Sequence, residues 1–242
     1  MPRAGLPTWL VVFSLLCVVL FVAGLVVYLQ RGSEPATHAA ANAAHEPEIS
    51  ARQAFRSPIF WNLILSMTAR SAAFTTVTTH FIPMMVWKGM SQTEASVLLA
   101  GFAIINLPIH FLLGWIADFV NKPKLVTICL LLGFVAVMPM LWSDSLWALW
   151  FFAALYSVLD ASIPVFWASV GDFFGRKSFG AIRGNMNLFY TWGAVLGPVL
   201  AGYVYDRTQS YALVFWAMAG SLLLSSAMTA LLIRPWANLR RE

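Results

Sequence analysis

Seven long apolar stretches, separated by short polar breaks, dominate this sequence. A bilayer core about 30 Å thick is crossed by roughly 20 helical residues, so each stretch is long enough to span it. Only 10% of the residues are charged, against about 25% in soluble domains. The pattern predicts an all-α integral membrane protein with seven transmembrane helices: Thr8–Gln30, Pro58–Trp87, Thr93–Ala117, Leu125–Leu141, Leu146–Val170, Gly184–Tyr205 and Ala212–Ile233.

The lysines and arginines predict the orientation of these helices. Of the 15 such residues, Arg3, Lys88 and Arg207 lie on one side, Arg70 lies inside a stretch, and the others lie on the opposite side. Cytoplasmic loops carry the excess of cations, so the C-terminus is expected in the cytoplasm and the N-terminus outside, in a bacterial inner or plasma membrane. This bias accounts for the net charge of +5 without a nucleic-acid partner.

The polar breaks divide the chain into predicted regions. Residues 8–30 form one helix, 31–57 a cytoplasmic linker, 58–234 a six-helix unit and 235–242 a cytoplasmic tail. His38 and His45 stand seven residues apart in the linker, which has no apolar periodicity. A solvated pair is favoured over a metal site, so neither a metal nor a cofactor is expected.

Polar residues inside the six later stretches follow a repeated order. In each group of three stretches, the first two carry polar side chains that are unfavourable in lipid, and the third carries none that ionises. The repetition predicts two three-helix repeats with inverted topology, a design that secondary transporters use. Polar members would line a cavity, and apolar members would form the lipid-facing rim.

Arg70, Asn106 and Asp160 are predicted to lie near the middle of the bilayer. With a rise of about 1.5 Å per residue, they lie ~18, ~20 and ~21 Å from the starts of their helices. A guanidinium in hydrocarbon needs a partner, which could be an anionic substrate, the Asp160 carboxylate, or both in alternation. A permanent structural ion pair is the alternative. These three residues are candidate substrate-binding residues, as are Asn187 and Tyr190, which share one helical face.

His80 and His110 are candidate gating or coupling residues. Imidazole titrates near neutral pH, and His80 precedes Pro83 near the outer end of its helix, so it fits a proton-linked gate or an interfacial histidine. His110 follows Asn106 by one turn on the same face, which fits either substrate contact or a packing hydrogen bond.

Two other motifs also have structural explanations. Ser91 and Glu94 form an S-x-x-E capping box. The stretch GAVLGPVLAG begins at Gly193, and its small residues and proline permit either close helix packing or a hinge. Gly197 and Pro198 in this stretch are therefore candidate gating residues.

The stretch GWIADFVNKPK, which begins at Gly114, resembles the loop signature G-x-x-x-D-[RK]-x-G-[RK]-[RK] of the major facilitator superfamily. Gly114, Asp118 and Lys122 match it. Asn121 replaces the glycine, and asparagine also tolerates a positive φ. In the family this loop tunes the conformational equilibrium, so the resemblance makes Asp118 and Lys122 candidate gating residues. The departures from the signature are Phe119, Asn121 and Pro123.

Three further stretches resemble the monocarboxylate and oxalate–formate porter branch of that superfamily. They are THFIPMMVWKGMSQTEASVLLAGFAIINLPIHFLLGWIAD, GDFFGRKSFGAIRG and GPVLAGYVYDRTQSY. The resemblance implies that residues 58–234 are a C-terminal six-helix half and that residues 8–30 are the last helix of an N-terminal half. Because five helices of such a porter are missing, we expect a fragment, a chain that pairs with a separate N-terminal half, or one that self-associates.

The resemblance implies secondary transport of a small organic anion, such as a monocarboxylate, with a proton or a second anion as the coupling species. The alternative is a non-transporting membrane protein that is a remnant or an assembly or regulatory partner. An enzyme is not expected, because the sequence has no G-x-S-x-G, no H-E-x-x-H and no paired intramembrane aspartates.

Overall fold

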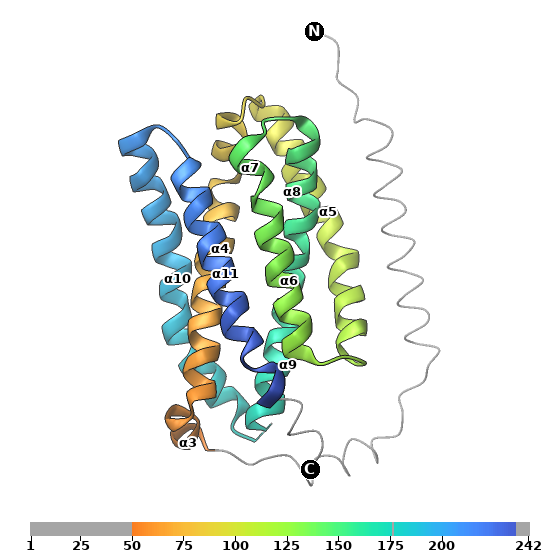
Figure 1. Ribbon diagram of the computed structural model, residues 1–242, viewed down its shortest axis with the longest axis vertical. Helices are drawn as coiled ribbons and strands as arrows, with labels where there is room; N and C mark the ends of the chain where they lie inside the picture. Colours follow the sequence, from red (N-terminus) through yellow and green to blue (C-terminus); the bar gives the residue numbers. More distant parts are fainter. Residues whose placement is uncertain (1–49, 176, 236–242) are drawn as a thin grey trace.

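The computed structural model describes residues 50–175 and 177–235, which form a bundle of α-helices (Figure 1). The predicted helix at residues 8–30, both linker histidines and the tail lie outside the described residues. The all-α membrane fold predicted from the sequence is confirmed. The helices are α3 (Ala51–Arg56), α4 (Pro58–Trp87), α5 (Gln92–Ala117), α6 (Lys122–Val137), α7 (Pro139–Trp142), α8 (Leu146–Ala161), α9 (Ile163–Phe174), α10 (Phe179–Thr208) and α11 (Ala212–Ala230).

Capping residues that are visible in the sequence set the starts of α4 and α5. The Ser57 hydroxyl accepts a hydrogen bond from the N–H of Ile59 at 3.2 Å, and Pro58 occupies the first turn of α4. The Ser91 hydroxyl accepts from the N–H of Glu94 at 3.2 Å, and the Glu94 carboxylate accepts from the N–H of Ser91 at 2.8 Å. The predicted capping box is therefore confirmed.

Two of the stretches predicted as continuous helices are broken at prolines. Pro139 follows the break between α6 and α7, and Pro164 lies two residues after Ser162, which separates α8 from α9. A proline has no N–H to donate, and its ring displaces the carbonyl of the preceding turn. Each broken pair still forms one stretch that is long and apolar enough to cross a membrane.

Five such membrane-crossing stretches are found in the described part of the chain: α5, α6 with α7, α8 with α9, α10, and α11 extended to Pro235. Helix α4 is not among them, although it has 30 residues. It carries Asn62, Arg70, His80 and several threonines, which lower its mean hydropathy. Because α4 packs against α5, α10 and α11, much of this polar surface is inside the bundle.

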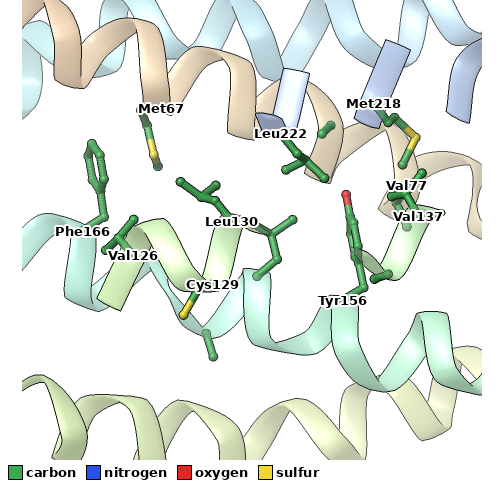
Figure 2. Packing of buried hydrophobic residues seen from close by; sticks show 14 of the residues in the cluster. Met67, Val77, Val126, Cys129, Leu130, Val137, Tyr156, Phe166, Met218 and Leu222 are labelled. Atoms are coloured by element: carbon green, nitrogen blue, oxygen red, sulfur yellow. The ribbon is translucent and has the colours of Figure 1, made fainter. Parts of the chain in front are cut away.

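The apolar helices α6 and α11, for which the sequence predicts a place on the lipid-facing rim, pack against each other. Leu130 and Val137 of α6 lie beside Leu222 and Met218 of α11 in the buried core (Figure 2). Helices α5 and α10, at opposite sides of the bundle in Figure 1, bury the smallest share of their length instead. Both α6 and α11 also keep exposed apolar side chains, such as Val135 and Trp216, so their place on the lipid-facing rim stays a prediction.

Small residues on α10 allow it to approach α4 closely. A Cβ atom at Gly193 would overlap the carbonyl oxygen of Thr68, and one at Gly197 would lie 2.5 Å from the carbonyl oxygen of Ala72. The helices could not reach this separation with larger residues in these positions. The close-packing explanation of the glycine stretch is therefore confirmed, with Pro198 directly after the second contact.

The Gly193→Ala substitution should weaken the packing of α4 against α10. We expect it to lower the free energy of unfolding by about 1–3 kcal/mol, because the added methyl meets backbone that cannot move away. Thermal unfolding of the purified chain in detergent measures this loss. Gly184→Ala is the matched control on the same helix, since nothing lies within 4 Å of its Cβ position. Equal melting temperatures for the two variants would contradict the packing argument.

Candidate functional site

Arg70 projects from the middle of α4 into the bundle and is only 2% exposed. Its Nη2 donates a hydrogen bond to the carbonyl oxygen of Leu159 at 2.7 Å and lies 3.5 Å from the carbonyl oxygen of Asp160. Its guanidinium carbon also lies 5.3 Å from the ring centroid of Phe74. Carbonyl dipoles and an aromatic ring therefore surround this charge, in place of the carboxylate that the sequence suggested.

The carbonyl groups that hold Arg70 are available because α8 ends beside them. Leu159 and Asp160 belong to the last turn of α8, where carbonyl groups have no continuing helix to bond. Pro164 has no N–H to offer the Asp160 carbonyl. The negative end of the α8 dipole lies at the same place and favours a cation. The end of α8 thus places the Leu159 carbonyl, which also accepts from the Ser162 hydroxyl at 2.6 Å, beside the buried guanidinium.

The Asp160 carboxylate is bonded to a different group. Its Oδ2 accepts a short hydrogen bond from Nδ2 of Asn106 on α5, and it forms no ion pair with Arg70. His110 Nδ1 lies 3.0 Å from the carbonyl oxygen of Asn106, which can only accept, so Nδ1 carries the proton. The structure brings these four predicted residues together but gives the guanidinium and the carboxylate separate partners.

Buried polar atoms in this cluster retain unused bonding capacity. Among the described residues, Arg70 Nε, Asn106 Oδ1 and the Tyr156 hydroxyl are buried and have no hydrogen-bond partner. The Tyr156 ring stacks on Phe74 at 6.1 Å, and Figure 2 shows its hydroxyl pointing between Leu222 and Val77. A buried donor or acceptor without a partner is energetically unfavourable. The Arg70 Nε donor and the Asn106 Oδ1 acceptor could therefore both form hydrogen bonds with a bound molecule.

Tyr190 contacts a further aromatic side chain, whereas Asn187 has no such contact among the described residues. Tyr190 is half-buried, and its ring lies 6.0 Å from the ring of Trp167. Asn187 is exposed, although it stands only three residues earlier on α10. Sequence reasoning missed Trp167, because a tryptophan near a predicted helix end is typical of an interfacial belt.

His80 links α4 to α10 and to the start of α11. Its Nε2 lies 3.1 Å from the carbonyl oxygen of Pro198, and its Nδ1 lies 3.2 Å from the hydroxyl of Tyr211. The carbonyl oxygen can only accept, so Nε2 donates, and in the neutral ring Nδ1 accepts from Tyr211. Burial raises the pKa of Tyr211, so this hydroxyl keeps its proton at neutral pH. Two predicted gating residues, His80 and Pro198, are thus in direct contact.

Lys122 forms the ion pair at the opposite end of the bundle. Its Nζ lies 2.9 and 2.7 Å from the two carboxylate oxygens of Asp172 on α9, and the two side chains are 13% and 28% exposed. Asp118, the other predicted gating residue of this loop, is exposed at the end of α5 and does not share this pair. The ion pair connects the start of α6 to the end of α9.

Asn121 has a different role from the one its position suggested. Its φ is −62°, so the left-handed conformation expected for the glycine it replaces does not occur. Its side-chain oxygen instead accepts from the N–H of Lys124 at 3.0 Å and caps α6. Its Nδ2 donates to the carbonyl oxygen of Ile233 at 3.2 Å. The asparagine therefore stabilises the loop as a helix cap.

No metal centre emerges from the described ranges, 50–175 and 177–235. Within them, no three His, Cys, Asp or Glu side chains are grouped so that they could hold a metal ion. His80 and His110 each bond to groups of neighbouring residues instead.

The sequence model of the Major Facilitator Superfamily matches residues 81–240, about two thirds of the chain. The matched range contains Asn106, Lys122 and Asp160, whereas Arg70 and His80 lie just before it. No individual curated protein matches the sequence.

The Lys122–Asp172 pair can be measured with a double-mutant cycle. Lys122→Ala, Asp172→Ala and the double variant should give a coupling free energy of about 1 kcal/mol, because the pair is only partly shielded from water. Thermal unfolding in detergent at low and high salt is the measurement, and the coupling should fall as salt rises. Strictly additive effects of the two substitutions would show that the ion pair does not connect α6 to α9.

Proposed function

The chain belongs to the major facilitator superfamily, and from this premise we propose that it carries a small organic anion, such as a monocarboxylate, by alternating access. Membership makes this a multi-pass membrane protein whose general activity is transport. The observation that carries the anion assignment is the buried guanidinium of Arg70, which is bonded to carbonyl groups alone. A cation in this setting favours an anionic ligand.

A carboxylate would compete well for Arg70. Carbonyl oxygens carry only partial negative charge, whereas a carboxylate carries a full one and can accept two parallel bonds from a guanidinium. The unpartnered Nε of Arg70 supplies the second donor. Anion binding would release the carbonyl groups of Leu159 and Asp160, so substrate occupancy would be linked to the junction between α8 and α9.

Asp160 is the proposed coupling residue. Its backbone carbonyl lies beside the guanidinium, and its carboxylate is held by Asn106 on α5. A second carboxylate entering this site would be repelled by an ionised Asp160, and a proton on Asp160 would remove that repulsion. This arrangement supports the proposal of proton symport with the anion. His110, bonded to the Asn106 carbonyl, would hold the Asn106 segment in place.

A second six-helix body is the proposed macromolecular partner, either a separate half or another copy of this chain. Helices α5 and α10 expose large apolar side chains on faces that no described element covers, and these helices also carry Asn106 and Tyr190. The cavity would then lie between the two bodies, as transporter repeats arrange it. The exposed apolar residues include Leu107, Leu112 and Trp115 on α5 and Leu188, Trp192 and Val199 on α10.

Replacing Arg70 tests the anion assignment. Arg70→Gln should lower the uptake of labelled lactate by at least about tenfold, because a full charge–charge interaction is worth more than 1.4 kcal/mol. Uptake into cells that express the chain is the measurement, and Lys124→Gln is the control for loss of one exposed cation. Unchanged uptake in Arg70→Gln would exclude the anion role. Uptake at background in the wild-type chain would favour the non-transporting alternative.

Replacing Asp160 tests the coupling role. Asp160→Asn should retain lactate exchange across vesicles at equal pH but lose the stimulation that an outside-acid pH gradient produces. The amide keeps the shape of the carboxyl group and cannot exchange a proton. Asp206→Asn, an exposed aspartate at the outer end of α10, is the control. If the pH gradient still stimulated uptake in Asp160→Asn, another group would carry the proton.

A further inference from the structure

A recess of about 530 Å³ opens at one end of the bundle, where α6 and α10 begin and α9 ends. The positive-inside bias predicts that this end is cytoplasmic. The recess is lined by two cations, one carboxylate and two aromatic rings, among them Lys122, Trp167, Asp172 and Arg183. A cavity of this size can take a small organic molecule.

The two cations of the recess have different surroundings. Lys122 is neutralised by the Asp172 carboxylate at 2.7 Å. The guanidinium carbon of Arg183 lies 4.8 Å from the ring centroid of Trp167, and no carboxylate of the described residues forms an ion pair with it. A guanidinium stacked on an aromatic face keeps its N–H edge available for a second partner. Arg183 therefore gives the recess a positive charge that can receive an oxyanion.

The wall of the recess continues towards Arg70. Trp167, which supports Arg183, also lies 6.0 Å from the ring of Tyr190. Trp167 stands seven residues after Asp160, whose carbonyl oxygen lies 3.5 Å from Nη2 of Arg70. Arg183 and Tyr190 stand seven residues apart on α10, which is about 10 Å along the helix. Two aromatic rings thus continue from the outer cation along α10 in the direction of the bundle interior.

We infer that this recess is an outer binding position for the carried carboxylate, with Arg183 as its ligand-binding cation and Trp167 and Tyr190 as the wall leading to Arg70. The inference rests on the proposed function and adds to it a second anion site on the cytoplasmic side. Arg183 would raise the local concentration of the anion and hold it before it replaces the carbonyl partners of Arg70. The phosphate of an anionic lipid is also an oxyanion. The experiments below distinguish a bound lipid headgroup from the carried carboxylate.

Sidedness of transport tests the outer site. In inside-out membrane vesicles, Arg183→Gln should raise the half-saturating lactate concentration at least about fivefold, because the recess then faces the added lactate. In right-side-out vesicles the same variant should behave as the wild type. Lys124→Gln removes a cation from the same membrane face outside the recess and should change neither value. An equal effect from both sides, or no effect, would overturn the inference.

Two further experiments distinguish a lipid headgroup from the carried anion, and the outer site from the proposed transport function. If the Arg183→Gln effect appeared only in vesicles containing phosphatidylglycerol and was absent in phosphatidylcholine alone, the recess would bind lipid headgroups and the inference would be wrong. If the wild-type chain carried no lactate, the proposed function would fail on its own. Binding in the recess would then be tested by the rise in melting temperature that lactate produces in detergent. Loss of this rise in Arg183→Gln would support the outer site. An unchanged rise would overturn it.

Discussion

The buried charge of Arg70 is the constraint on which the arrangement of the bundle depends. A guanidinium at 2% exposure inside an apolar bundle requires strong acceptors. The acceptors come from the last turn of α8, where the Leu159 carbonyl accepts from both Arg70 and the Ser162 hydroxyl. The buried cation on α4 is therefore stabilised by the backbone break that follows α8.

The packing around α4 holds this cation in place. Gly193 and Gly197 let α10 approach the α4 backbone, and the Ser66 and Ser225 hydroxyls bond between α4 and α11 at 3.0 Å. In a bilayer, close packing and interhelical hydrogen bonds take over much of the role that the hydrophobic effect has in water. The helix with the buried charge is thus held on several sides, while α5 and α10 keep exposed apolar faces.

Separate partners keep the two central charges available. If Arg70 and Asp160 neutralised each other, neither would attract a substrate anion or a proton strongly. Arg70 is bonded to carbonyl dipoles and Asp160 to an amide, so each can exchange its partner for a charged one. The same logic applies at the recess, where Asp172 neutralises Lys122 and leaves Arg183 on an aromatic ring. This pattern supports the proposed passage of an anion between two cations.

The sequence by itself determined the all-α membrane fold and the capping box at Ser91. These follow from local hydropathy and helix caps, which neighbouring residues encode. Only the tertiary structure decided that Arg70 bonds to carbonyl groups, that Trp167 lies against Arg183 and Tyr190, and that α6 and α11 pack together. Those outcomes depend on how helices far apart in the chain are placed and rotated against one another, and local sequence patterns do not specify that geometry.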